Sequence, residues 1–144
     1  VMAVARKPVI ASHSNCRALV PVPRNLTDEQ IAALAEKSGV IGMNALDVFT
    51  HQDRYGATAD HLVDHVDHVV KIAGIDHVGI GFDLCDSLKN HLGVPNPLVH
   101  RDVIQGHGDL GSFTAALIRR GYSDENILKI LGGNFARVYE AVLD

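Results

Sequence analysis

Polar side chains that can bind metal ions or transfer protons follow three short apolar segments of this sequence. His13 ends the first segment and Asp83 closes the third, while Asn44 and Asp47 stand near the end of the second. Short, uniformly apolar segments are typical of strands buried in a parallel sheet. Because the loops that follow parallel strands gather at one end of the sheet, we expect these side chains to share one rim.

The chemistry of this rim has more than one interpretation. An imidazole with carboxylates is a ligand set that suits zinc, so His13 is either a metal ligand or a hydrogen-bonded core histidine. Asp83 is either a catalytic, metal-binding carboxylate or a cap of its own loop. Arg24 follows a loop with two prolines and could hold a substrate carboxylate in a two-pronged hydrogen bond, although an ordinary surface arginine is the simpler interpretation.

A second group of histidines lies in the segment DHLVDHVDHVV. His61, His65 and His68 recur at positions i, i+4 and i+7, and two histidines four residues apart can chelate a metal ion on a helix. Each histidine here alternates with an aspartate, and the helix lacks the glutamate base of the metalloprotease motif. We therefore interpret this side as a solvated, charged helix face.

Two further patterns are assigned structural roles. Cys16 and Cys85 lie far apart without CxxC spacing, which predicts two free, buried thiols. The segment Gly132 to Asn134 lacks the lysine that follows a phosphate-binding loop. It is interpreted as a helix junction with a glycine C-cap and an asparagine N-cap.

Capping and turn signals predict the elements that position these residues. Thr27 with Gln30 forms a capping-box pattern before a helix that ends at Gly39, and Thr58 caps a helix that ends near Gly74. The predicted strands are Val9 to Ser12, Val40 to Leu46 and His77 to Asp83, and further helices are predicted over Ser112 to Arg120, from Ser123 to Leu131 and over NFARVYEAVL. Strands that alternate with helices predict an α/β fold with a parallel sheet.

Three parallel strands do not complete such a sheet. Both edges would keep unpaired backbone groups, so we expect additional strands on the N-terminal side and interpret the chain as part of a barrel. Residues 1 to 144 form one unit in this interpretation, because no internal repeat or low-complexity segment is evident.

Composition excludes several classes of partner. The chain has 144 residues, of which 47% are hydrophobic, and a net charge of -4. An acidic chain without a cluster of basic residues is not expected to bind nucleic acid. No apolar stretch approaches the roughly 20 residues needed to cross a bilayer, so no membrane partner is expected from this segment.

Five segments together resemble a known family: PVIASHSNCRAL, PRNLTDEQI, GVIGMN, DHVDHVVKIAGIDHVGIGFD and GYSDENILKILGGNFARV. They are similar, in order, to the C-terminal half of the membrane (renal) dipeptidase family, including its bacterial members. The resemblance implies a TIM-like (β/α)8 barrel of which this chain covers roughly the last three β/α units and the C-terminal helices. It also implies two zinc ions, hydrolysis of dipeptides and, for a bacterial-type member, a cytoplasmic location.

The resemblance implies roles for four residues. His13 would bind zinc, and Asp83 would lie at the metal centre, where it accepts and returns a proton. Arg24 would hold the substrate carboxylate, and Phe49 would stand where the family carries a substrate-binding tyrosine. The segment GFDLCD also departs from the family's GSDFDG, so a loop glycine is absent.

The remaining zinc ligands of the family, an HxD pair, a bridging glutamate and a second histidine, would precede Val1. Two alternatives to a dipeptidase stay open on the sequence. One is a related metal-dependent hydrolase that acts on lactones or N-acyl amino acids, and the other is a zinc-free, non-catalytic homologue. A homo-oligomer is also left open.

Overall fold

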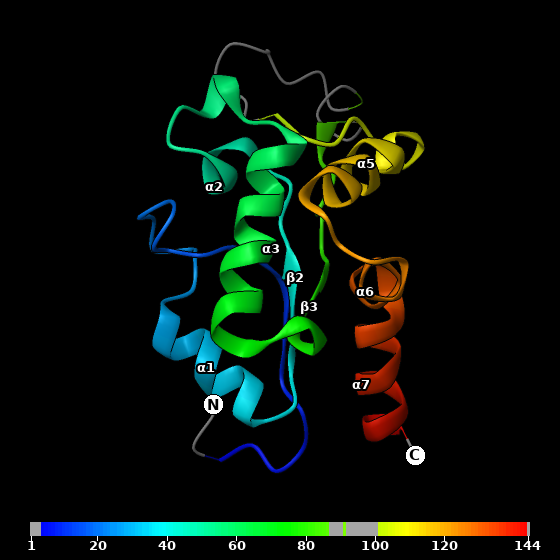
Figure 1. Ribbon diagram of the computed structural model, residues 1–144. Coiled ribbons are helices and arrows are strands. Elements are labelled where there is room, and N and C mark those ends of the chain that lie inside the picture. Colours follow the sequence, from blue (N-terminus) through cyan, green and yellow to red (C-terminus); the bar gives the residue numbers. More distant parts are fainter. Residues whose placement is uncertain (1–3, 87–90, 92–100, 144) are drawn as a thin grey trace.

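The sheet is the centre of the protein, and its strands are parallel. A computed structural model describes residues 4–86, 91 and 101–143. Strands β1 (Ile10–Ser14), β2 (Val40–Met43) and β3 (Val78–Ile80) pair in the order β1-β2-β3, and their carboxyl ends point the same way (Figure 1). The predicted parallel α/β arrangement is therefore confirmed for this part of the chain.

Helices connect and flank these strands. The connections from β1 to β2 and from β2 to β3 contain α1 (Asp28–Glu36), then α2 (Asp47–Thr50) and α3 (Ala59–Ala73), while α5 (Leu110–Arg120), α6 (Asp124–Leu128) and α7 (Asn134–Leu143) follow β3. Single turns of 3-10 helix occur at η1 (Arg54–Gly56), η2 (Ile75–His77) and η4 (His107–Asp109), and a π-helical turn η5 (Lys129–Gly133) joins α6 to α7. In Figure 1, α1 and α3 lie on one side of the strands, and α5, α6 and α7 lie on the other.

Local signals set the two long crossover helices. The Thr27 side chain accepts from the Gln30 amide and the Gln30 side chain accepts from the Thr27 amide, as the sequence predicts. Thr58 caps α3 in the same way, with the His61 imidazole in the place of the usual glutamate or glutamine. Gly74 ends α3 with a φ of 92°, a conformation that glycine adopts without a steric penalty.

The hydrophobic core lies between α3 and the sheet. Leu62, Val66 and Val69, which recur at positions i, i+4 and i+7, are fully buried on one face of α3. They share one core cluster with Ile41 and Met43 of β2. The burial of this cluster fixes the direction of the strands, and so the place where their carboxyl ends meet.

The other face of β3 is covered by α7. A Cβ atom at Gly79 would lie 2.7 Å from the Phe135 ring, so the absence of a side chain at Gly79 allows this close packing. Asn134 begins α7 and donates from its side-chain amide to the carbonyl oxygens of Ile75 and Val78. The predicted helix junction is confirmed, but the predicted N-cap role of Asn134 is wrong, because its amide binds the segment that leads into β3.

The strands differ from their predicted bounds. β1 begins one residue later than predicted and continues through His13 to Ser14, while β2 and β3 end before Asn44 and Asp83. Their apolar sequences continue past the last parallel hydrogen bonds, because a buried loop has the same residue preferences as a buried strand. Among the described residues, no helix is long and apolar enough to cross a membrane.

Candidate metal and substrate site

The carboxyl ends of β1 and β3 bring an imidazole to a carboxylate. His13 Nε2 lies 3.8 Å from Asp83 Oδ2, and both side chains are partly exposed. The other ring nitrogen, His13 Nδ1, lies 2.8 Å from Ser12 Oγ, so Nε2 is the nitrogen directed at the carboxylate. Asp83 has a φ of 57°, an uncommon conformation for a residue other than glycine, and the chain turns sharply there.

Glycines allow this approach across the intervening strand. A Cβ atom at Gly42 of β2 would lie 2.3 Å from Ser12 O and 2.9 Å from Gly81 Cα. A Cβ atom at Gly81 would lie 2.0 Å from the same Ser12 oxygen. Any side chain at Gly42 or Gly81 would push β1 and the segment after β3 apart. The short distance between His13 and Asp83 therefore depends on Gly42 and Gly81, which have no reactive side chain.

Buried amide side chains fix the loops around this pair. Asn44 donates from Nδ2 to Asp83 Oδ2 over 3.3 Å, and its amide nitrogen donates to Asn15 Oδ1 over 3.0 Å. Asn15 Nδ2 donates to the carbonyl oxygens of Asn44 and Phe49. Asn15 and Asn44 are both 1% exposed, so these hydrogen bonds are shielded from water and hold the three loops rigidly.

The second pair of predicted residues also comes together. The Arg24 guanidinium carbon lies 6.0 Å from the centre of the Phe49 ring, within the range of a cation–π contact. Ser14 Oγ donates to the carbonyl oxygen of Arg24, and Asn25 Nδ2 donates to that of Phe49. No described residue forms a salt bridge with the guanidinium, which leaves its donors available to a ligand carboxylate.

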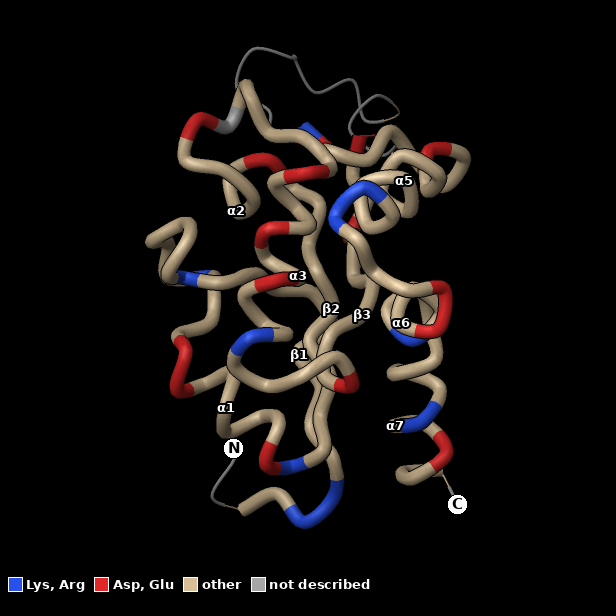
Figure 2. Tube along the Cα trace, viewed as in Figure 1, with Lys and Arg blue, Asp and Glu red and all other residues tan. Residues whose placement is uncertain are grey.

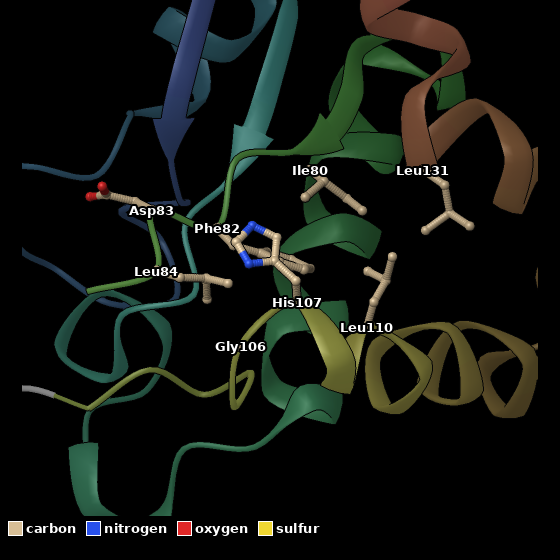
Figure 3. Close-up of a pocket in the computed structure, with 8 residues that line it drawn as sticks. All are labelled: Ile80, Phe82, Asp83, Leu84, Gly106, His107, Leu110 and Leu131. Atoms are coloured by element: carbon tan, nitrogen blue, oxygen red, sulfur yellow. The ribbon is translucent and has the colours of Figure 1, made fainter. Parts of the chain in front are cut away.

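An apolar cavity of about 630 Å³ adjoins the same end of β3. The side chains of Phe82, Leu110 and Leu131 border it together with His107 (Figure 3). Asp83 lines this cavity too, but its carboxylate points away from Leu110 and Leu131, towards the end of β1. The charged pair and the apolar space therefore adjoin the same loop, the one that carries Asp83.

The aspartates of α3 form a separate charged surface. Asp60 pairs with Arg119, and Asp64 and Asp67 both pair with Arg120. Figure 2 shows the acidic segments of α3 beside the basic end of α5. This confirms the predicted charged helix face for the aspartates, which stabilise the contact between two helices.

The histidine of the same helix that lies between these aspartates in sequence is different. The structure buries His65 completely, so its prediction as part of a solvated face is wrong. A position four residues from an exposed residue can still turn inward when a loop packs over the helix, and the Cys16 loop does so here. Burial also raises the pKa of the Cys16 thiol to about 12, so this cysteine stays protonated at neutral pH.

Asp47 takes no part in the His13 and Asp83 pair. It begins α2, is 3% exposed and accepts from the Val48 amide. Cys85 is partly buried, and neither cysteine forms a disulfide. Asn15 and Thr50 were not among the predicted site residues; an asparagine directly after a strand that carries a histidine is the signal that could have identified Asn15.

The geometry of His13 and Asp83 fits part of a zinc site. Zinc bound to an imidazole nitrogen and a carboxylate oxygen at its usual bond lengths holds these atoms roughly 3.3 Å apart, close to the observed 3.8 Å. Ser12 is placed to orient the ring through Nδ1, as a hydrogen-bond partner of a metal-binding histidine does. Within the described part of the chain, no group of three or more His, Cys, Asp and Glu side chains is placed to hold a metal ion.

Comparison with known proteins identifies the family of this chain. The model of the membrane dipeptidase family, peptidase family M19, matches residues 1–144. The chain belongs to the membrane dipeptidase family. Dipeptidase tcpJ of Claviceps purpurea is 37% identical over 144 residues, which cover 98% of this chain and 31% of that protein. Dipeptidase ataJ of Aspergillus terreus is 36% identical and is matched over 33% of its length.

Two solved structures resemble this chain over nearly its whole length. A metallo peptidase from Rhodobacter sphaeroides, bound to a phosphinate mimic of the dipeptide L-Ala-D-Ala, has a TM-score of 0.79 at 28% identity over 97% of this chain and 38% of that chain. An amidohydrolase from Pseudomonas aeruginosa has a TM-score of 0.85 at 25% identity over 98% of this chain and 47% of that chain. The chain thus spans about a third of the length of the curated dipeptidases that it matches.

Proposed function

We propose that this chain forms the C-terminal part of a zinc-dependent dipeptidase whose complete fold is a TIM-like (β/α)8 barrel with two zinc ions. His13 and Asp83 are metal ligands in this proposal, and Asp83 also transfers the proton. Arg24 binds the C-terminal carboxylate of the dipeptide, with Phe49 packed against its guanidinium. Membership of the membrane dipeptidase family supports peptide bond hydrolysis as the reaction.

One observation carries the proposal: His13 of β1 and Asp83 after β3 lie 3.8 Å apart, although another strand separates β1 from β3. A merely structural aspartate would be expected to cap its own loop. The Asp83 carboxylate instead points towards the end of β1, and among the described residues its side chain accepts one hydrogen bond, from Asn44 Nδ2 to Oδ2. Its second oxygen is therefore available to a proton or a cation.

Zinc, when bound, lowers the pKa of a coordinated water towards neutrality and polarises the scissile carbonyl. Asp83 would accept a proton from the water whose oxygen attacks the carbonyl carbon. The same carboxyl group then gives the proton to the amine nitrogen as the peptide bond breaks, which leaves two amino acids. Arg24 holds the substrate carboxylate at a fixed distance from this point, which restricts the enzyme to short peptides.

Replacement of Asp83 by Asn in the full-length protein tests the proposal. We expect hydrolysis of L-Ala-D-Ala to fall by a factor of about 10² to 10⁴, the usual contribution of a positioned general base. The zinc content, measured by elemental analysis, separates loss of metal from loss of proton transfer. Turnover close to that of the unmodified enzyme would remove Asp83 from the mechanism.

A second candidate function is hydrolysis of N-acyl amino acids or lactones by the same centre. The apolar cavity beside Phe82 favours it, because an acyl chain would be buried there more readily than a charged amine. A panel of L,D-dipeptides, N-acyl amino acids and lactones separates these activities by their kcat/KM values. A zinc-free homologue would bind no zinc on purification and would gain no activity when zinc is added.

A further inference from the structure

His65 is a buried polar side chain to which none of the preceding roles applies. It lies in the middle of α3 and is fully buried, whereas its neighbours in the histidine series, His61 and His68, remain partly accessible. Burial of an imidazole in an apolar core is unfavourable unless both ring nitrogens find partners. The partners of His65 therefore indicate what this residue does.

Both ring nitrogens of His65 bind backbone groups outside α3, one in the loop after β1 and one at the end of α2. The amide nitrogen of Cys16 donates to Nδ1 over 3.0 Å, and Nε2 lies 3.0 Å from the carbonyl oxygen of Thr50. Because an amide can only donate to Nδ1, the proton is on Nε2 and is donated to Thr50. The ring is thus a neutral imidazole with one fixed tautomer, and both of its hydrogen-bonding positions are occupied.

The two segments that His65 binds also contain Arg24 and Phe49, which contact each other. The Cys16 amide opens the segment that leads from the end of β1 to Arg24, and Thr50 ends the short helix α2 next to Phe49. The same segments meet again through Asn25, whose amide donates to the carbonyl oxygen of Phe49. One rigid ring on α3 therefore spans the base of both segments.

We propose that His65 is a positioning residue that sets the separation of Arg24 from Phe49, and so the affinity of the enzyme for the C-terminal carboxylate of its substrate. The inference rests on the proposed function, because it names the group that orients the carboxylate-binding arginine. His65 itself touches neither substrate nor metal in this proposal. It acts through the backbone of Cys16 and Thr50.

A simple packing role predicts different behaviour. An apolar residue of similar size fills a core without the cost of burying two polar nitrogens, and it would leave the loops to other contacts. The hydrogen bonds of His65 reach the loop after β1 and the last carbonyl of α2, which has no partner within its own helix. Loss of the imidazole should therefore shift the loops more than it disturbs α3.

The test compares His65→Phe with Val66→Ala in the full-length enzyme. Phenylalanine keeps the ring volume and leaves Cys16 N–H and Thr50 C=O unpaired, while Val66→Ala removes packing from the same helix without touching a polar group. We expect His65→Phe to raise KM for L-Ala-D-Ala about tenfold with kcat changed less than about threefold. Val66→Ala should lower stability and leave KM unchanged.

Two further measurements make the result specific. The preference of the enzyme for a dipeptide over its C-terminal amide should fall in His65→Phe by the same factor as KM rises. His65→Gln, which can still accept and donate, should recover part of this preference. Equal KM values for His65→Phe and Val66→Ala would overturn the proposal and reduce His65 to a core residue.

Amide hydrogen exchange separates failure of this inference from failure of the proposed function. We expect His65→Phe to speed exchange in segments 15–26 and 47–53 of the full-length protein while α3 stays protected. This measurement needs no turnover, so it decides the positioning role even if no dipeptide is hydrolysed. Unchanged exchange in both segments would refute it.

Discussion

Two polar regions of this protein have similar residue types and opposite properties. At the ends of the strands, His13, Asp83 and Arg24 keep donors and acceptors accessible, and serine hydroxyls and the buried amide of Asn44 hold them in place. On the contact between α3 and α5, the aspartates and arginines neutralise one another. Charged residues that pair with one another have no donors or acceptors left for a ligand. Charged residues that are held by other polar groups keep theirs, and such residues form a candidate site.

The largest effect is expected from a substitution that fills the space between the strands and so disturbs the first of these two regions. Gly42→Ala places a Cβ atom against backbone atoms of Ser12 and Gly81, which cannot rotate away. We expect the full-length variant to lose about 1–3 kcal/mol of stability and most of its activity, because His13 and Asp83 separate. Urea unfolding and dipeptide turnover measure the two effects.

Gly111→Ala is the matched control for this substitution. A Cβ atom at Gly111, in α5, meets nothing within 4 Å, so alanine there should raise helix stability slightly and leave turnover unchanged. Wild-type activity in Gly42→Ala would show that the strand ends tolerate a side chain between them.

The second prediction concerns the pH dependence of stability. Burial lowers the pKa of His65 to about 4 from the model-peptide value of 6.5, with the Asp64 carboxylate acting in the opposite sense and His68 and His61 in the same sense as burial. The unfolded chain therefore binds a proton at this residue below about pH 6.5, while the folded chain binds it only below about pH 4. The free energy of unfolding falls as the pH falls through this window.

The size of this effect follows from the same shift. His65 should cost the folded state about 3 kcal/mol by pH 4, of which about 2 kcal/mol is lost already at pH 5. Denaturation of the metal-free, full-length protein at pH 7 and pH 5 measures it. The difference between the two pH values should shrink in His65→Phe and persist in His61→Gln; equal slopes in all three proteins would contradict the burial of a neutral imidazole.

Replacement of an arginine in each region gives the third prediction. Arg24→Lys removes the planar two-pronged donor, so KM for a dipeptide should rise about tenfold while stability stays the same. Arg119→Lys on α5 should leave KM unchanged, because Arg119 pairs with Asp60 of the protein and not with a substrate carboxylate. Steady-state kinetics of the two full-length variants decide between them, and equal KM values would count against Arg24 as the carboxylate-binding residue.

The smallest effect is expected on the neutralised surface itself. Asp64→Asn weakens one of the two carboxylate contacts of Arg120, and both side chains are more than a third exposed. Water screens such pairs, so the expected loss is below about 1 kcal/mol with no change in kinetics. Thermal unfolding measures the loss, and a marked change in KM would mean that this surface is coupled to the site.

Much of the fold could be predicted because the signals are local. The capping boxes, the glycine that ends α3 and the apolar stripe of that helix involve residues within a few positions of one another. The site was predicted only in part. Polar residues at strand ends indicated His13, Asn44 and Asp83, but the roles of Asp83 and Arg24 came from family resemblance and stay predictions.

The position of a residue relative to the core is a different kind of property. His61, His65 and His68 have nearly the same sequence surroundings, and one of them alone is fully buried, because the Cys16 loop packs over that position. The need for glycine at position 42 could not be predicted from the sequence either, because its close neighbours belong to two other segments. Neither the burial of His65 nor the close packing at Gly42 produces a periodic pattern in the sequence.

The sequence by itself determined the alternation of strands with the long helices, the caps of α1 and α3 and the residues able to bind a metal ion or a carboxylate. Only the tertiary structure decided that His13 and Asp83 meet across a glycine, and that His65 joins two loops. The physical reason is the distance along the chain over which each interaction acts. Capping and amphipathic periodicity act within one or two helical turns, whereas these contacts join residues 15 to 70 positions apart, whose register is set by packing of the core.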